Sequence, residues 1–218
     1  MSAPTVFVVD DDAAVRDALS LLISLKGLRV STFSCAEDFL AIYEPQWRGC
    51  LLADLQMPGL SGLELQHRLV ERGISLPVIM LTAHGDVATA RAALKNGAVD
   101  FLEKPVDDDV LIDVLQNAIR VDADRHRAQA LHLQVAQRLE RLTAREKDVL
   151  LLLSEGLQHR EIAGRLAISP RTVEVYKARM MEKLQCRTLA EVIRIAAEAR
   201  GDGPAAEASS SSGPPRAS

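Results

Sequence analysis

The sequence predicts an α/β protein with three parts: a doubly wound (βα)5 domain with a parallel sheet, a helical linker, and a small all-α domain of four helices. Two observations support this fold class. Over the first 120 residues, short apolar runs alternate with segments of helical periodicity, and beyond residue 142 two capping-box patterns open further helices. A chain of 218 residues has room for two such domains.

The strands are expected at five apolar runs, residues 5–9, 30–33, 50–53, 77–81 and 100–102. The helices that alternate with them are expected at residues 13–26, 36–44, 61–72, 86–96 and 107–120. Such alternation is typical of a parallel sheet with helices on both faces. Ligands of these sheets bind at the carboxyl ends of the strands, so the residues that follow each apolar run form the candidate site.

The segment after the fifth strand is expected to stay helical, because residues 107–142 contain neither glycine nor proline. Its apolar stripe (Val110, Val114, Leu115 and Ala118) ends near residue 119. We therefore predict a first domain at residues 1–120 and a helical linker at residues 121–138.

The C-terminal domain is predicted at residues 139–200. Thr143 and Glu146 form a capping box for a helix that ends at Gly156, and Thr188 and Glu191 form a second box. Two shorter helices are expected between them, at 159–166 and 170–184. Residues 201–218 are mostly Gly, Pro, Ala and Ser, which predicts a disordered tail.

Composition excludes several classes of protein. Aromatic residues make up 3% of the chain, which predicts an aliphatic core and excludes a base-stacking platform for single-stranded nucleic acid. No apolar run is long enough to span a membrane and the first residues do not resemble a signal peptide, so we expect a cytoplasmic protein without membrane contact. Cys35, Cys50 and Cys186 match no metal-ligand spacing, which indicates reduced cysteines that serve in packing.

Charge is unevenly distributed along the chain. Residues 1–120 contain 10 basic and 17 acidic residues, whereas residues 143–199 contain 10 basic and 8 acidic ones. An acidic first half favours a bound cation, and a slightly basic second half is compatible with DNA.

Polar side chains follow the predicted strands, and these side chains are Asp10, Asp11, Asp54, Thr82 and Lys104. In a parallel sheet they converge on one edge, where crowded carboxylates require a cation. Oxygen ligands at this density favour Mg²⁺. Lys104 is either an ion-pair partner that holds the acids together or a contact for a phosphate. With a metal and Lys104 nearby, Asp54 is suited to accept a phosphoryl group.

Four segments resemble the receiver domain of two-component response regulators: VVDDD at 8–12, LLADLQMPGLSG at 51–62, TAHGD at 82–86 and FLEKP at 101–105. The resemblance implies that Asp54 is the phosphoacceptor, modified to 4-aspartylphosphate. It implies that Asp10, Asp11, Asp54 and the backbone carbonyl of Gln56 bind Mg²⁺, and that Lys104 contacts the phosphate. It also places Gln56 and His84 near the water that hydrolyses the phosphorylated aspartate.

The same resemblance identifies Thr82 and Phe101 as a switch pair, with Phe101 as plain core the alternative. Phosphorylation is then expected to change the surface around the helix at 86–96 and to favour a homodimer. Arg91, Lys95 and Asp100 are the candidate dimer-interface residues, and a merely solvated helix face is the alternative.

On a helical wheel, Val173, Met180 and Leu184 share the buried face of the helix at 170–184, with Tyr176 beside them. The opposite face is mixed, as in a helix that enters the major groove of DNA, although a solvated helix has a similar face. LTAREKDVLLLLSEGLQHREIAGRLAISPRTVEVYKARMMEKLQCRT resembles the LuxR-type helix-turn-helix of NarL/FixJ regulators, closest to the FixJ branch. The candidate phosphate contacts are His159, Arg160 and Lys177, and the candidate groove contacts are Arg171, Thr172, Glu174, Val175 and Arg179.

The two resemblances together imply a transcription regulator, in this family usually an activator, and not an enzyme beyond self-phosphotransfer and autodephosphorylation. The implied partners are a sensor histidine kinase, double-stranded promoter DNA and RNA polymerase. Two alternatives stay open. A haloacid-dehalogenase-like phosphatase would use Asp10 as nucleophile and Asp12 as acid/base, and a DNA-binding regulator could carry a receiver that is never phosphorylated.

Overall fold

A five-stranded parallel sheet forms the centre of residues 1–127, one of two compact units into which the chain divides. The computed structural model describes residues 3–83 and 87–200. The strands are β1 (Thr5–Val9), β2 (Arg29–Phe33), β3 (Gly49–Asp54), β4 (Val78–Thr82) and β5 (Asp100–Glu103). Their order across the sheet is β2-β1-β3-β4-β5, and all four neighbouring pairs are parallel. The predicted doubly wound fold is confirmed.

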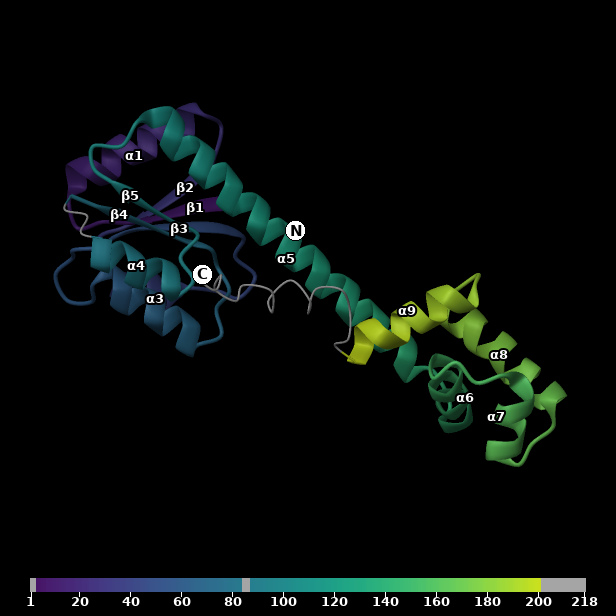
Figure 1. The fold of residues 1–218 in the computed structure, drawn as a ribbon. Coiled ribbons are helices and arrows are strands. Elements are labelled where there is room, and N and C mark those ends of the chain that lie inside the picture. The colour runs from purple at the N-terminus through teal and green to yellow at the C-terminus, as the bar shows by residue number, and fades with distance from the viewer. Residues whose placement is uncertain (1–2, 84–86, 201–218) are drawn as a thin grey trace, which may run out of the picture. The chain divides into compact units, whose positions relative to one another are not determined.

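Helices cover both faces of this sheet (Figure 1). They are α1 (Ala13–Leu25), α2 (Ala36–Ile42), α3 (Gly62–Glu71), α4 (Val87–Lys95) and α5 (Asp108–Glu140). Buried residues of α1 and α5 pack on one face of the sheet, and those of α2, α3 and α4 pack on the other. The strands are therefore buried on both sides, which explains why their sequences are continuous apolar runs.

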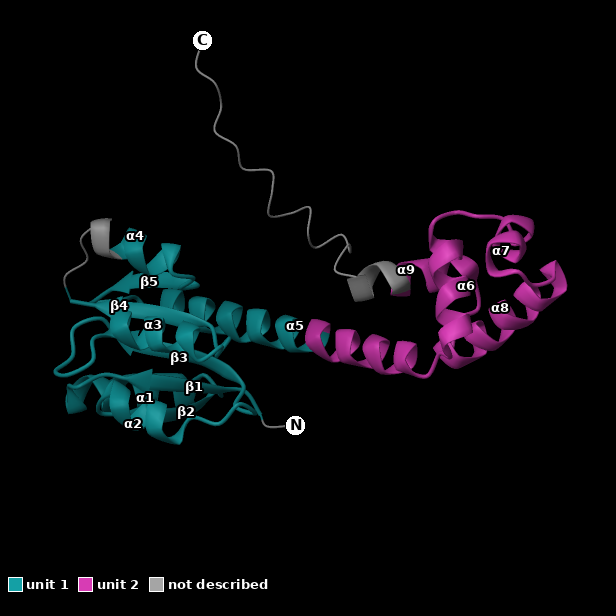
Figure 2. Ribbon diagram, turned by 90° about the horizontal axis from the view of Figure 1, so that it is seen from below, with its two compact units in different colours: residues 1–127 teal, residues 128–218 magenta. Residues whose placement is uncertain are grey.

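Helix α5 runs without interruption through the segment predicted as a linker. The two compact units divide within it, at residues 127 and 128 (Figure 2). The buried residues of α5 are Leu111, Ile112, Leu115, Ala118 and Asp122. Val110, which the sequence placed on the apolar stripe, is instead 48% exposed.

Residues 128–218 form the second unit, whose helices beyond α5 are α6 (Ala144–Ser154), α7 (His159–Leu166), α8 (Pro170–Leu184) and α9 (Leu189–Arg200). The predicted four-helix architecture is confirmed. Thr143 and Glu146 form the expected capping box, and Ser169 caps α8 with Pro170 at its first position. The predicted tail at 201–218 lies outside the described residues.

Aromatic side chains gather in one part of the first unit, where Phe7, Phe33, Phe39, Tyr43 and Trp47 contact one another. The expected aliphatic core therefore does not hold on the face that α2 covers, where aromatic rings are buried together. Edge-on and stacked contacts between these rings add to the stabilisation that comes from buried area.

The start of β3 is fixed by the backbone of Gly49, which lies beside Thr5 of β1. Its φ of +126° is a conformation that residues with a side chain rarely adopt, and a Cβ built there would lie 1.9 Å from the carbonyl oxygen of Thr5. The Gly49 N–H also donates to Asp122 of α5 over 2.9 Å. This one glycine thus joins β1, β3 and α5 at the amino ends of the strands.

The Asp122 carboxylate is buried on α5, and its second oxygen has no hydrogen bond. His126 Nε2 lies 3.3 Å from that oxygen, close enough for an ion pair but outside hydrogen-bond geometry. Nearby Cys50 is also buried, and burial with the charge of Asp122 raises the pKa of its thiol to about 12. The thiol stays protonated, as expected of a cysteine that serves in packing.

We predict that Gly49→Ala destabilises the first unit by about 4 kcal/mol or more, because backbone must move to relieve the overlap with Thr5. Gly73→Ala is the matched control, since Gly73 has a φ of +66° with open space around it. This substitution should lower the free energy of unfolding by only about 1 kcal/mol. Hydrogen exchange should show lost protection of β1 and β3 in Gly49→Ala, with residues 128–200 unchanged. Equal protection in the two variants would contradict the prediction.

In the second unit, Glu146 is buried and joins α6 to α8. Its carboxylate accepts from the Thr143 N–H over 2.7 Å and from Lys183 Nζ over 2.6 and 2.9 Å. Burial raises the pKa of Glu146, but the contacts with Lys183 and Thr143 outweigh it, and the pKa lies below its usual value. The folded unit therefore favours the ionised carboxylate.

We predict that the second unit loses stability as the pH falls below about 4.3, the ordinary glutamate pKa, because the unfolded chain then binds a proton that the folded one resists. The contribution is fully present above that pH. Glu146→Gln should remove this part of the pH dependence and lower stability by about 1 to 3 kcal/mol at pH 7. Scanning calorimetry of the full chain from pH 3 to 7 measures the stability of the wild type and of Glu146→Gln. Parallel pH profiles for these two proteins would contradict the prediction.

Candidate functional site

The carboxyl ends of the strands bring the predicted polar residues to one edge of the sheet. Val9 pairs with Ala53, so Asp10 follows β1 directly beside Asp54, which ends β3. Thr82 ends β4, and its carbonyl oxygen accepts from the Lys104 N–H over 2.7 Å. The sheet thus gathers the five predicted positions because its strands are parallel and in register.

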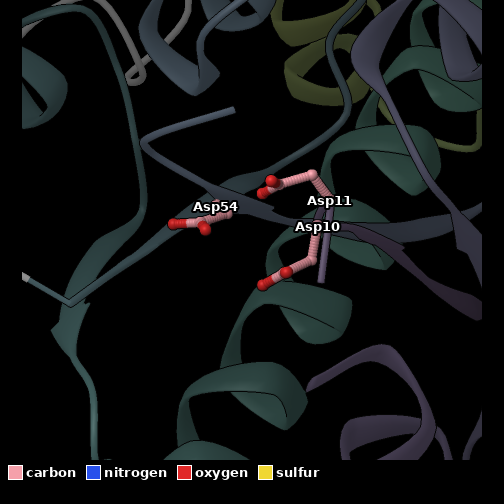
Figure 3. Close-up of side chains that lie close together, drawn as sticks. All are labelled: Asp10, Asp11 and Asp54. Atoms are coloured by element: carbon pink, nitrogen blue, oxygen red, sulfur yellow. The ribbon is translucent and has the colours of Figure 1, made fainter. Parts of the chain in front are cut away.

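Three carboxylates meet at this edge. Oxygens of Asp10, Asp11 and Asp54 all lie within 4.8 Å of one another, and Figure 3 shows the three side chains close together. Asp10 is 1% exposed, Asp54 is half-buried and Asp11 is exposed. The group is therefore open to solvent on the Asp11 side and closed behind Asp10.

Lys104 is the cation of this edge. Its Nζ lies 2.7 Å from Asp10 Oδ2 and 3.2 Å from Asp54 Oδ2. Burial lowers the pKa of Lys104, but both carboxylates outweigh it and the pKa lies above its usual value. Burial also raises the pKa of Asp54; Lys104 opposes this and Asp10 adds to it, and the pKa stays raised. The single ammonium group of Lys104 therefore does not offset the combined effect of burial and of Asp10 on Asp54.

The loop after β3 is held close to Asp54. A Cβ at Gly62, the first residue of α3, would lie 2.3 Å from the Asp54 carbonyl oxygen, so only glycine fits this approach. Glu37 of α2 accepts from the Leu60 N–H over 3.1 Å. Gln56 is exposed, and its N–H lies 3.5 Å from Asp54 Oδ1. His84 lies outside the described residues.

The two residues predicted as a switch lie on neighbouring strands. Thr82 is fully buried at the end of β4. Phe101 is half-buried on β5 and packs against the core cluster of the face that α2, α3 and α4 cover. This arrangement is compatible with both the switch and the core alternative for Phe101.

The donor set fits a divalent ion of the magnesium type. Asp10, Asp11 and Asp54 offer only oxygen atoms, and no cysteine or histidine belongs to the group found among the described residues. Mg²⁺ prefers carboxylate and carbonyl oxygens and retains several waters, which suits a site that is open on one side.

Sequence reasoning missed Arg16 of α1, which contacts the loop of the acidic residues. Its Nη1 donates to the carbonyl oxygens of Asp10 over 2.7 Å and Asp11 over 2.9 Å. No motif marks this residue, because a helical arginine is usually a solvated surface residue.

The candidate dimer residues lie on α4 and β5. Arg91 and Lys95 are exposed on α4, and Asp100 is half-buried at the start of β5. The Asp100 carboxylate already accepts from the Phe101 N–H over 2.8 Å.

In the second unit, α8 presents the expected faces. Val173, Met180 and Leu184 are fully buried, and Tyr176 packs beside them. The predicted groove residues Arg171, Glu174, Val175 and Arg179 are exposed, as is Arg160 of α7.

Three of the predicted DNA contacts already have partners within the domain. Thr172 is half-buried, and its hydroxyl lies 2.8 Å from that of the cap residue Ser169. His159 Nδ1 lies 2.7 Å from Glu174 Oε1, which joins the start of α7 to α8. Lys177 is half-buried.

Comparison with known families assigns both units. Residues 6–116 match the family described as "Response regulator receiver domain", and residues 140–196 match "Bacterial regulatory proteins, luxR family". Within the described residues, no helix combines the length and apolar character needed to cross a membrane.

Known proteins are similar to this chain over most of its length. The chain is 44% identical over 191 residues to the transcriptional regulatory protein FixJ of Azorhizobium caulinodans. The aligned region covers 88% of this chain and 90% of the relative. It is 40% identical over 208 residues to FixJ of Rhizobium meliloti, covering 94% and 100%.

Solved structures agree with this assignment. The response regulator StyR matches with a TM-score of 0.82 and 40% identity, covering 90% of this chain and all of that one. Full-length FixJ from B. japonicum matches with a TM-score of 0.57 and 40% identity, covering 92% and 99%. With both domains matched in order and relatives similar over most of its length, the chain belongs to the two-component response regulators of the NarL/FixJ class, transcription regulators with a receiver and a LuxR-type DNA-binding domain.

Proposed function

We propose that the protein is a phosphorylation-dependent activator of transcription, in which Asp54 accepts a phosphoryl group from a sensor histidine kinase. The observation that carries the proposal is the position of Asp54: half-buried at the end of β3, within 4.8 Å of Asp10 and Asp11, and 3.2 Å from Lys104. A phosphoryl group bound there meets an ammonium group on one side and metal-binding carboxylates on the other.

The transfer needs little covalent chemistry from the protein. An Asp54 oxygen forms a bond to phosphorus while the bond between phosphorus and the kinase histidine nitrogen breaks, and that nitrogen keeps the electron pair and takes up a proton. Asp10, Asp11, Asp54 and the Gln56 carbonyl would hold Mg²⁺, which neutralises charge on the transferring group. Lys104, now held by two carboxylates, would turn to the phosphoryl oxygens, and water near Gln56 would later hydrolyse the product.

The phosphoryl group would act on the rest of the protein through Thr82 and Phe101. Moving the Thr82 hydroxyl to a phosphoryl oxygen leaves space that Phe101 can fill, which alters the surface of α4 and β5. A homodimer through Arg91, Lys95 and Asp100 would then bring two α8 helices to promoter DNA. Recruitment of RNA polymerase and a cytoplasmic location belong to the same proposal.

The structure gives a specific argument against the phosphatase alternative. That reaction requires Asp12 as a mobile acid/base, but Asp12 is the N-cap of α1 and accepts from the Ala14 N–H over 2.8 Å. The cap ties the Asp12 side chain to α1 and does not leave it free to move at the site. Asp54 also has no role in that reaction.

We predict that acetyl phosphate and Mg²⁺ add about 80 Da, one phosphoryl group, to the wild-type chain, and that Asp54→Asn abolishes the addition because the acceptor oxygen is lost. Intact mass spectrometry measures it. Asp12→Asn is the matched control and should still be modified. An addition that survives Asp54→Asn but is lost in Asp10→Asn would point to the phosphatase instead, and none at all with the cognate kinase would indicate a receiver that is not phosphorylated.

We predict that Arg91→Glu weakens the phosphorylated dimer at least tenfold, about 1.4 kcal/mol, because it places a negative charge where the proposed interface has Asp100. Analytical ultracentrifugation of the phosphorylated chain measures the dissociation constant. Arg29→Glu is the control, since Arg29 is exposed on β2 at the opposite edge of the sheet. An unchanged dimer in Arg91→Glu would count against this interface.

A further inference from the structure

The loop between β1 and α1 carries two of the three clustered carboxylates, and its parts are held unequally. Asp10 is fixed at its side chain, by Lys104 over 2.7 Å and by the Asp12 N–H over 2.9 Å. The Asp11 side chain is exposed and takes part in no hydrogen bond or ion pair found among the described residues. The direction of the Asp11 carboxylate therefore depends on its backbone.

Arg16 is the side chain that holds this backbone. One guanidinium nitrogen donates to the carbonyl oxygens of both Asp10 and Asp11, over 2.7 and 2.9 Å. These two bonds fix the peptide planes on either side of the Asp11 Cα, and with them the direction of its Cβ. Hydrogen bonds from a charged donor are stronger than neutral ones, so the restraint is effective even at a half-exposed position.

The position of Arg16 is unfavourable for the helix to which it belongs. Arg16 lies in the first turns of α1, where the helix dipole disfavours a cation, and the capping carboxylate at that end, Asp12, accepts from the Ala14 N–H and makes no ion pair with Arg16 among the described residues. Its contacts are instead with the backbone of the acidic loop. The interaction that offsets the unfavourable position is therefore the one with Asp10 and Asp11.

We propose that Arg16 is a positioning residue for the divalent cation: it holds the Asp11 backbone so that the Asp10 and Asp11 carboxylates converge before the ion arrives. This inference rests on the proposed function, which requires a cation at these carboxylates. Residues that orient metal ligands without touching the metal commonly change its affinity by about 10- to 100-fold when they are replaced. Arg16 acts on the ligands through their carbonyl groups and leaves all carboxylate oxygens available.

The positive charge of Arg16 would change the affinity for Mg²⁺ in the direction opposite to positioning. A guanidinium group near the site repels a divalent cation, so a purely electrostatic Arg16 would weaken binding and its removal would strengthen it. Positioning and repulsion thus predict changes in opposite directions. A variant that removes both the charge and the donor separates them.

The experiment is calorimetric titration of the full unphosphorylated chain with MgCl₂, for the wild type, Arg16→Met and Arg16→Lys. Methionine keeps an unbranched stem without charge or donor, and lysine keeps the charge and a donor nitrogen on a shorter reach. Arg68→Met is the control, because Arg68 is exposed on α3 and pairs only with Glu71 among the described residues. Thermal unfolding in EDTA establishes that each variant is folded.

We expect the Mg²⁺ dissociation constant of Arg16→Met to rise about tenfold, with Arg16→Lys between it and the wild type and Arg68→Met unchanged. Phosphorylation by acetyl phosphate should then need more Mg²⁺ for half-maximal rate, with the maximal rate retained at saturating Mg²⁺. A dissociation constant that falls or stays the same in Arg16→Met would overturn the proposal. Failure of the wild type to bind Mg²⁺ would instead overturn the proposed function, so the two results are distinguishable.

Discussion

The mutual repulsion of three carboxylates at the ends of adjacent parallel strands is the constraint on which the rest of this receiver depends. Parallel pairing brings Asp10 and Asp54 to the same edge, and the turn into α1 adds Asp11. Lys104 contributes a single positive charge, and burial together with the charge of Asp10 keeps the pKa of Asp54 raised beside it. A site with this excess of negative charge favours a divalent cation, and once the cation is bound it can accept an anionic phosphoryl group.

Much of the surrounding structure serves to keep these groups in place. Gly62 allows α3 to begin against the Asp54 carbonyl, Glu37 holds the intervening loop at Leu60, and Arg16 holds the loop on the other side. The opposite ends of the strands are secured separately, by Gly49 and Asp122. The reactive edge is thus built on a rigid sheet, while the contacts that aim its side chains come from loops and helix ends.

The sequence predicted the strands, the helices and the members of the pocket, because each depends on local patterns: apolar runs, capping boxes and polar residues at strand ends. It failed where the outcome depends on contacts distant in sequence. Asp122 lies on the buried face of α5, in step with Leu111, Leu115 and Ala118, and its carboxylate is supported there by the Gly49 N–H, which is distant in sequence, and by His126. Arg16 likewise has no motif, since its partners are carbonyl groups, which every residue possesses.

The aromatic cluster beneath α2 has an optical consequence. Trp47 is the only tryptophan of the chain, and it is stacked on Phe7 with ring centroids 4.6 Å apart. Excitation at a wavelength that only tryptophan absorbs therefore produces fluorescence from the receiver alone. The emission wavelength shifts when water reaches the indole ring. Trp47 thus reports unfolding of the receiver and not of the DNA-binding domain, so the two unfolding steps can be separated without an added label.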